Sequence, residues 1–125
     1  RDLAITAESD LLDFAVMVAS RLTYEIGRLD REAAKANLSR ALRLVSSKTD
    51  VLIRVHPDDL ATMAEFADSV LKQAESSPAV RLEADESMAP GGCRVRSEPM
   101  EIDATLETQI DAMVALLLGK TKADD

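Results

Sequence analysis

The sequence predicts an α+β fold, in which an N-terminal helical hairpin precedes a small mixed β-sheet of three or four strands packed with two helices. Apolar residues recur at helical spacing through the first 45 residues. A nearly continuous apolar run at 51–55 is typical of a buried strand. Segments 80–85 and 93–98 alternate apolar and charged residues, as half-buried strands do. The expected order of elements is α-α-β-α-β-β-(β)-α.

Residues 2–27 are expected to form one long helix with a wide apolar stripe. The members of the stripe are Leu11, Ala15, Val18, Leu22 and Ile26, broadened by Leu12, Val16 and Ala19. This stripe covers more surface than one short helix can bury. We therefore expect Leu11, Ala15, Val18 and Leu22 to contact a second copy of the chain, as the end of a stalk or coiled coil. The alternative is that the helix packs on its own domain alone.

Gly27 is expected to end this helix in the left-handed conformation common after a helix C-terminus. Asp30 can then cap a second helix that runs from Arg31 to about Ser47. The buried stripe of that helix should be Leu38, Ala41, Leu42 and Val45. The expected organisation is a helical hairpin at 1–49, a mixed α/β C-terminal domain at 50–118 and a frayed tail at 119–125.

The strand at 51–55 is expected at the centre of the sheet, because its apolar character indicates burial on both faces. The residues that follow it, HPDD, are a strong helix start with Pro57 at the first helical position. That helix should run to about Glu75, before a polar Ser-Ser-Pro segment. If the strands on either side of it are parallel, the crossover should be right-handed.

The two alternating segments are expected to pair as an antiparallel hairpin, joined by a loop that contains Pro90, Gly91 and Gly92. In one register, where the numbers of paired residues sum to 179, opposite charges face each other throughout. That register pairs Asp85 with Arg94, Glu83 with Arg96 and Arg81 with Glu98. Slipping a strand by one residue would turn its apolar side outward.

A short strand at 100–102 should precede the last helix, 104–118. Asp103 has the residue type and the position of the N-cap of this helix. Gly119 should stop the helix. Its apolar stripe should contain Leu106, Ile110, Met113, Val114 and Leu117.

Composition excludes several function classes. Aromatic residues make up only 2% of the chain, and its net charge is −8, which divides into +1 for residues 1–49 and −9 for residues 50–125. Such a chain repels phosphate backbones and lacks aromatic platforms, so nucleic acid is not an expected partner. One cysteine and one histidine allow neither an internal disulfide nor a Cys/His zinc site, and we expect no cofactor. No apolar run reaches the roughly 20 residues of a membrane span.

Single residues that suggest catalysis all have simpler structural interpretations. His56 lies in a turn before a helix and has no positioned nucleophile. Cys93 opens a strand and should point inward as a small hydrophobic residue. The Gly91-Gly92 pair lacks the rest of a phosphate-binding motif, and Asp58 and Asp59 suit a helix start better than a cation site. We therefore expect no enzymatic activity.

The segment around the glycines resembles the C-terminal domain of the FliH-type family. The resemblance rests on Pro90, Gly91, Gly92 and Cys93 and on the run EIDATLETQ at 101–109. Residues 53–60 are similar to the strand-to-helix turn of the family, with His56 where Asn is expected. The family includes the flagellar export-ATPase regulator and the type III secretion stator protein, with distant similarity to a peripheral-stalk protein of V-type ATPases.

The resemblance implies a non-catalytic cytoplasmic subunit that forms a homodimer, binds the N-terminal region of the export ATPase and restrains it. Such a subunit would lie peripheral to the membrane-embedded export apparatus, without inserting into the membrane. It would reach other secretion components through a region N-terminal to this chain, which we expect to be a fragment of a longer protein. A ring-building scaffold module of the same kind of machine is the alternative. The long apolar helix at 2–27 favours the stator.

Overall fold

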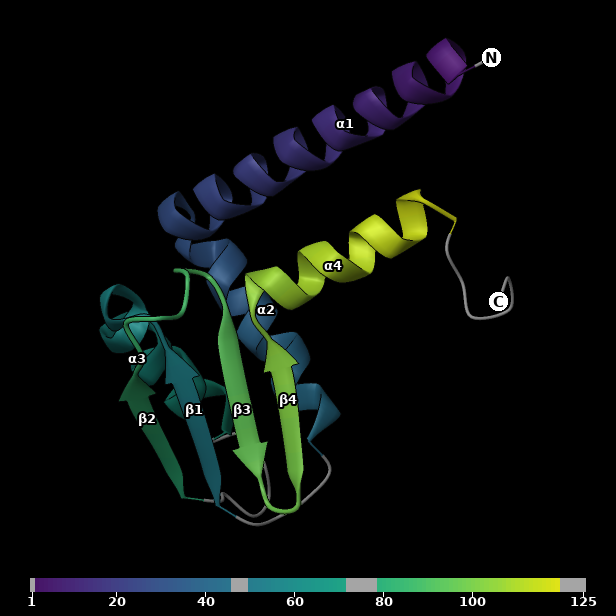
Figure 1. Ribbon diagram of the computed structural model, residues 1–125. Coiled ribbons are helices and arrows are strands. Elements are labelled where there is room, and N and C mark those ends of the chain that lie inside the picture. Colours follow the sequence, from purple (N-terminus) through teal and green to yellow (C-terminus); the bar gives the residue numbers. More distant parts are fainter. Residues whose placement is uncertain (1, 46–49, 72–78, 120–125) are drawn as a thin grey trace.

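The computed structural model describes residues 2–45, 50–71 and 79–119, which form four α-helices and a four-stranded mixed sheet (Figure 1). The α+β class and the N-terminal helical hairpin are as the sequence predicts. In chain order the elements are α1 (Asp2–Leu29), α2 (Arg31–Leu44), β1 (Val51–Val55), the 3₁₀ turn η1 (Pro57–Asp59), α3 (Leu60–Leu71), β2 (Val80–Ala84), β3 (Cys93–Ser97), β4 (Met100–Ala104) and α4 (Leu106–Leu117).

Strand β1 lies inside the sheet, whose strand order is β2-β1-β3-β4, as its apolar composition predicts. It pairs in parallel with β2 and antiparallel with β3, so that Ile53 is opposite both Leu82 and Val95. Strand β4 pairs antiparallel with the other edge of β3. The expected burial of β1 on both faces is wrong, because Leu52 and Arg54 remain half-buried while their neighbours in the strand are buried.

Helices α2 and α3 pack on one face of the sheet, and the other face carries no helix among the described residues (Figure 1). The core lies between these two layers. Its largest fully buried apolar side chains are Leu38 from α2, Met63 from α3, and Ile53, Val55 and Val95 from the strands. Helix α1 extends away from this body and packs along α4 rather than on the sheet (Figure 1).

The expected hairpin between residues 80–85 and 93–98 is wrong. Both segments form strands, but β2 and β3 lie on opposite sides of β1, and no residues of the two strands pair. The charges find other partners: Glu83 contacts Arg54 at 3.4 Å, and Arg94 contacts Asp103 at 3.9 Å. The most apolar strand takes the centre because burying it contributes more than surface ion pairs do.

Several helix boundaries also differ from expectation. Helix α1 continues through Gly27, which has no positive φ, and Asp30 follows its last residue. Asp30 caps α2 as predicted, accepting hydrogen bonds from the N–H groups of Glu32 and Ala33 at 2.9 and 3.3 Å. Helix α2 ends at Leu44, before the predicted end near Ser47, and the predicted end of α3 near Glu75 lies outside the described residues. The last helix begins at Leu106 rather than at 104, because β4 extends to Ala104.

Candidate functional site: a protein-interaction surface

In the described part of the chain, His56 and Cys93 have structural surroundings, and no metal centre is formed. No three His, Cys, Asp or Glu side chains among these residues lie close enough together to hold a metal ion. The His56 Nδ1 accepts a hydrogen bond from the Asp58 N–H at 3.0 Å, so His56 caps η1. Burial raises the pKa of Cys93 to about 12, which keeps its thiol protonated and unreactive near neutral pH. Of the described helices, none has the length and hydropathy to cross a membrane.

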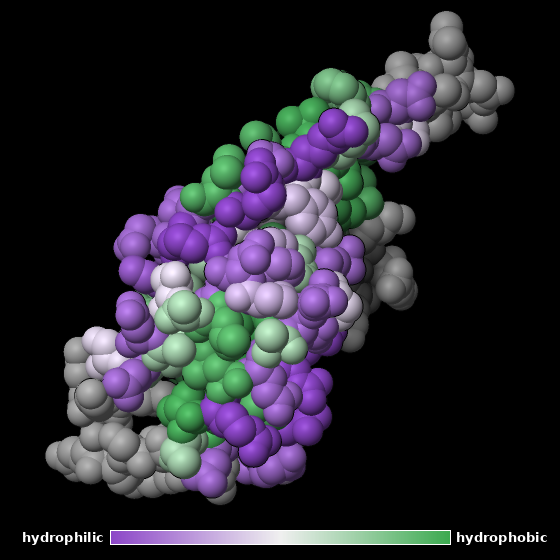
Figure 2. Space-filling view, turned by 90° about the vertical axis from the view of Figure 1, so that its left-hand side faces the viewer, coloured by the Kyte–Doolittle hydropathy of each residue, from purple (hydrophilic) through white to green (hydrophobic). Residues whose placement is uncertain are grey.

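The most unusual surface feature is an uncovered apolar stripe on α1, which we call the outer stripe. Its members are Leu11, Phe14, Ala15, Val18, Leu22, Ile26 and Leu29. They follow helical spacing along one side of α1, and Leu11, Leu22 and Leu29 are 68%, 57% and 66% exposed. In the upper part of Figure 2, green hydrophobic side chains lie along the molecule among purple hydrophilic ones. The predicted contact residues Leu11, Ala15, Val18 and Leu22 thus share one exposed side of the helix.

The opposite side of α1 carries smaller residues and is the side that the chain itself covers. Val16, Ser20 and Thr23 are partly buried and Gly27 is buried, at spacings of four, three and four residues. Thr23 and Gly27 border a cavity of about 170 Å³ whose lining includes Leu106 and Gln109 of α4. The monomer therefore covers the side of α1 with the small residues and leaves the side with the large ones exposed.

Electrostatics link the same two helices. The pKa of Tyr24 on α1 is raised above its ordinary value, first by partial burial and then by the carboxylates of Glu107 and Asp111 on α4. The distal half of α4 is also apolar and uncovered. Met113, Leu116 and Leu117 are 37%, 78% and 55% exposed. The two helices together present apolar surface that nothing in the described chain buries.

A close backbone crossing fixes the base of α1 against the glycine loop. A Cβ on Gly27 would lie 2.4 Å from the Pro90 carbonyl oxygen and 2.8 Å from Leu106 Cδ1. A Cβ on Gly91 would lie 2.6 Å from Gly27 Cα, and Gly91 has a φ of 96°. Gly27 is therefore needed for close approach and not for a helix end. Helix α1 therefore packs at Gly27 against the loop that contains the predicted Pro-Gly-Gly motif.

Buried polar groups reinforce this crossing. The Asn37 side-chain amide of α2 donates to the Gly91 and Ala104 carbonyls at 3.0 and 2.9 Å. The Gln109 amide of α4 donates to the Asn37 Oδ1 at 3.1 Å. Because Asn37 is 6% exposed, these hydrogen bonds satisfy groups that water does not reach. Asn37 thus joins α2, α4 and the glycine loop at one point.

Asp59 makes a second connection at the same place. It is 1% exposed, its Oδ2 accepts a hydrogen bond from the Gly91 N–H at 2.8 Å, and its Oδ1 contacts the Arg31 guanidinium. Arg31 also donates to the Gly27 carbonyl. A buried carboxylate requires such partners. Arg31 and Asp59 therefore connect the end of α1 to η1 and to the glycine loop.

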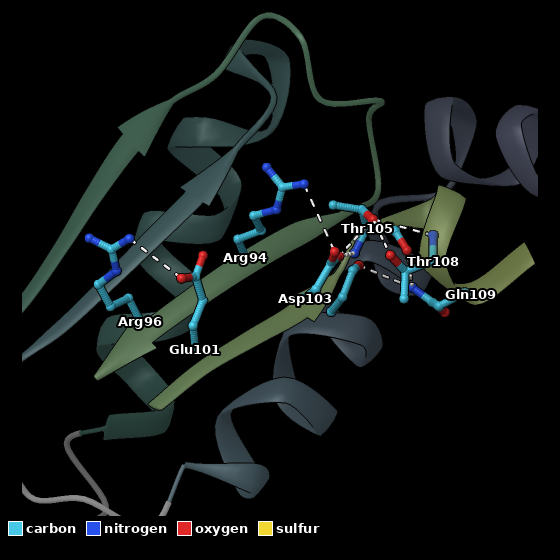
Figure 3. Close-up of polar contacts among 8 residues, drawn as sticks. Arg94, Arg96, Glu101, Asp103, Thr105, Thr108 and Gln109 are labelled. Atoms are coloured by element: carbon cyan, nitrogen blue, oxygen red, sulfur yellow. Dashed lines mark hydrogen bonds and ion pairs between the residues drawn. The ribbon is translucent and has the colours of Figure 1, made fainter. Parts of the chain in front are cut away.

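The prediction for the start of the last helix is correct about a hydrogen bond to Asp103 and wrong about the N-cap residue. Asp103 lies in β4, and the N-cap of α4 is Thr105, whose Oγ1 accepts a hydrogen bond from the Thr108 N–H at 3.3 Å. Asp103 Oδ1 accepts the expected hydrogen bond from the Thr105 N–H at 2.9 Å and another from its hydroxyl at 2.7 Å (Figure 3). Burial raises the pKa of Asp103, but these bonds, with Thr108 and Arg94, outweigh it and lower the pKa overall.

Sequence reasoning missed Asn37 and Thr105, and it assigned Asp59 only to a helix start. Asn37 did carry a signal, since an amide beside the buried stripe of a helix must find a partner. Asp59 carried no usable signal, because its neighbour Asp58 is exposed and equally suited to a helix start. Thr105 gives a weaker signal than Asp103, because threonine is less strongly preferred at an N-cap than aspartate.

A family model and several relatives match the sequence of the chain. The family model described as flagellar assembly protein FliH matches residues 2–113, which include all of α1, the whole sheet and the first part of α4. The chain belongs to the FliH family. Its relatives include a type 3 secretion system stator protein of Yersinia enterocolitica, which is 33% identical over 88 residues and covers 68% of this chain and 40% of the relative.

Two further relatives are flagellar proteins. The flagellar assembly protein FliH of Escherichia coli K12 is 30% identical over 104 residues, covering 81% of this chain and 43% of the relative. The FliH protein of Borreliella burgdorferi is 22% identical over 106 residues, covering 85% and 35%. This FliH-family chain spans 35–43% of the length of these three relatives.

Proposed function

We propose that this chain is part of a non-catalytic stator subunit of a flagellar or type III export apparatus. It forms a homodimer through the outer stripe of α1 and binds the N-terminal region of the export ATPase through its sheet body, restraining that enzyme. The subunit works from the cytoplasmic side, peripheral to the membrane-embedded apparatus. Family membership and the names of the stator and flagellar relatives support this role.

The outer stripe is the single observation on which the proposed homodimer rests. Burying one large aliphatic side chain contributes about 1.5–3 kcal/mol. Leu11, Leu22 and Leu29 are each more than half exposed, so covering all three with a second copy offsets much of the entropy of association. A stripe with this spacing suits pairing with another helix along its length. Such a contact leaves the sheet body free for the ATPase.

The outer stripe of α1 also distinguishes the stator hypothesis from the ring-building scaffold hypothesis. A ring module needs only the sheet body, and α1 with its apolar outer side would then have no role. In a stator, α1 is the end of the stalk, and the crossing of Gly27 on Gly91 holds it in a fixed direction. A stalk that restrains an enzyme mechanically requires such a fixed connection.

The test combines the chain with the purified N-terminal region of the export ATPase from the same organism. Size-exclusion chromatography with light scattering should show a complex that contains two copies of the chain, and ATP hydrolysis by the full ATPase should slow when the chain is added. A folded chain that neither binds nor slows the ATPase would contradict the ATPase assignment. Ring-sized assemblies of the chain alone would favour the scaffold.

A further inference from the structure

Strand β2 forms one edge of the sheet, and no strand among the described residues pairs with its open side. The Asp85 N–H donates a hydrogen bond to the Val55 carbonyl at 2.8 Å, and in a parallel ladder alternate residues bond to the same neighbour. The backbone groups of odd-numbered residues therefore face β1. The N–H and C=O groups of Val80, Leu82 and Ala84 point to the open side, where an added strand can bond to them.

The side chains of β2 on the helix-facing side of the sheet are apolar and incompletely covered. Val80 lies opposite Val51, and Leu82 lies opposite Ile53. Val51 and Ile53 are 3% and 0% exposed, whereas Val80 and Leu82 are only half-buried. In the lower part of Figure 2, which views the molecule from the side of β2, green apolar side chains form a patch bordered by purple ones. The open edge thus combines outward backbone groups with partly exposed apolar side chains.

A hollow of about 400 Å³ lies beside this edge, between β2 and α3. Its lining includes Val80 and Leu82 of β2 and Ala64, Glu65 and Asp68 of α3. The three α3 residues share one side of that helix by their spacing, and Glu65 and Asp68 are exposed. Residues 50–125 carry a net charge of −9, so the sign of these two carboxylates is also that of the surrounding domain. The hollow therefore has an apolar floor and an acidic rim, which favours a cation.

We propose that the open edge of β2 binds an extended basic segment of a partner protein, which adds to the sheet as a further antiparallel strand. Antiparallel pairing is slightly more stable per residue than parallel pairing. Alternate side chains of the added strand then lie over the hollow. A lysine at such a position covers Val80 and Leu82 with its aliphatic stem and brings its ammonium group to Glu65 and Asp68.

Two other occupants suit this edge less well. A second copy paired through its own β2 would place both α3 helices on the same face, with their acidic sides toward each other, which is unfavourable. A partner helix bonds its backbone groups internally and leaves the outward groups of Leu82 without a partner. The edge of β2 is separate from the outer stripe. The proposal therefore holds whether or not the export ATPase supplies the segment.

The test uses NMR titration of the isotope-labelled chain with a short peptide in which lysine and threonine alternate. Shift changes should centre on β2 and α3, and the Leu82 amide should exchange with solvent at least about tenfold more slowly at saturation. A control peptide of the same composition, with its lysines in adjacent pairs, should bind at least about fivefold more weakly. Equal binding of the control, unchanged exchange at Leu82, or no saturation by about 1 mM peptide would overturn the proposal.

Backbone methylation of the peptide tests the strand geometry. In the antiparallel arrangement the lysines lie opposite Val80 and Leu82, and their N–H groups face β2. Methylating two lysine backbone nitrogens should therefore abolish saturable binding, whereas methylating two threonine backbone nitrogens should leave affinity within about threefold. Equal effects of the two modifications, or a larger effect at threonine, would contradict the antiparallel addition.

Variants of the chain test the acidic rim. Glu65→Gln with Asp68→Asn should weaken binding of the alternating peptide about fivefold. Asp10→Asn with Asp13→Asn makes the same change of net charge at the same spacing on exposed positions of α1, and should leave affinity within about twofold. Equal weakening by the two pairs would reduce the effect to net charge and overturn the proposal. Slow exchange of the Leu82 amide without peptide, increasing with chain concentration, would assign the edge to a second copy and contradict the proposal.

Discussion

The sheet body and the two projecting helices of this chain use apolar residues in opposite ways. In the body, Leu38 and Ile53 are fully buried between the sheet and the helices that cover it. On α1, Leu11 is 68% exposed and lies on a side that no described residue covers. The body therefore has its own buried core, whereas α1 and the distal half of α4 have apolar surface that no described residue covers. The glycine crossing at Gly27 and Gly91 is where the two regions meet.

Replacing a leucine by alanine should have very different effects on stability in the two regions. Leu38→Ala removes a fully buried side chain and should lower the free energy of unfolding by about 2–5 kcal/mol. Leu11→Ala should change it by less than about 0.5 kcal/mol in the dilute monomer, because little burial is lost. Urea denaturation of both variants measures this contrast. Comparable losses would mean that the chain buries the outer stripe itself.

Gly27→Ala tests the connection between the two regions. The added methyl group would meet the Pro90 carbonyl oxygen at 2.4 Å, so either α1 or the loop must move. Overpacking of this kind costs about 1–3 kcal/mol, which exceeds the roughly 0.5–1 kcal/mol that alanine gains over glycine in a helix. Thermal denaturation should therefore show a net loss of stability. An unchanged or higher melting temperature would show that the loop can withdraw and that the crossing is not tight.

Thr105→Ala tests the attachment of α4 to the body. Loss of this N-cap should lower the free energy of unfolding by about 0.5–2 kcal/mol. Asp103→Ala should destabilise as well, because Asp103 holds the Thr105 hydroxyl and N–H. The double variant should lose less than the sum of the two single losses, since the residues act as one unit. Strict additivity in chemical denaturation would contradict this arrangement.

The smallest effect concerns pH. The pKa of Asp103 is lowered in the folded chain, because the hydrogen bonds from Thr105 and Thr108 and the charge of Arg94 outweigh burial. Asp103 therefore stabilises the fold above its ordinary pKa of about 4, and this contribution is lost as pH falls through the lowered value. Asp103→Asn should make the loss of stability between about pH 5 and pH 3 shallower. If the stability of the Asp103→Asn variant depended on pH as that of the wild type does, this contribution would be ruled out.

Local patterns were enough to predict most elements. Helical spacing located α1 and α2, the composition of 51–55 placed β1 inside the sheet, and Asp30 caps α2 as its residue type indicates. The inward direction of Cys93 also follows from strand alternation and is confirmed by its burial. These features depend on residues that are close in the sequence, so periodicity and capping preferences specify them.

Strand pairing could not be predicted from charges. Strands β2, β3 and β4 alternate apolar residues with charged ones, and β1 also carries Arg54. Glu83 can therefore pair with an arginine on more than one strand. Opposite-charge pairs contribute little on a surface, and the burial of Ile53 between Leu82 and Val95 decides the strand order instead. Charge complementarity alone therefore allowed several equivalent registers.

The joint between α1 and the glycine loop could not be predicted because its residues are distant in sequence. Gly27 must be glycine on account of Pro90 and Gly91, and Asp59 is buried on account of Arg31 and Gly91. In each case the partner lies on another element, and local sequence preferences contain no information about it. The local explanation of Gly27, a helix end, was accordingly wrong.

The mass of the chain in solution tests the proposal that the outer stripe joins two copies. Sedimentation equilibrium should give a dimer for the wild type and a monomer of about 13.5 kDa for Leu11→Glu with Leu22→Glu, with circular dichroism showing that the variant keeps its sheet. Arg28→Glu makes the same change of net charge off the stripe and should remain dimeric. A wild type that stays monomeric at about 100 μM, or a double variant that stays dimeric, would contradict the proposal.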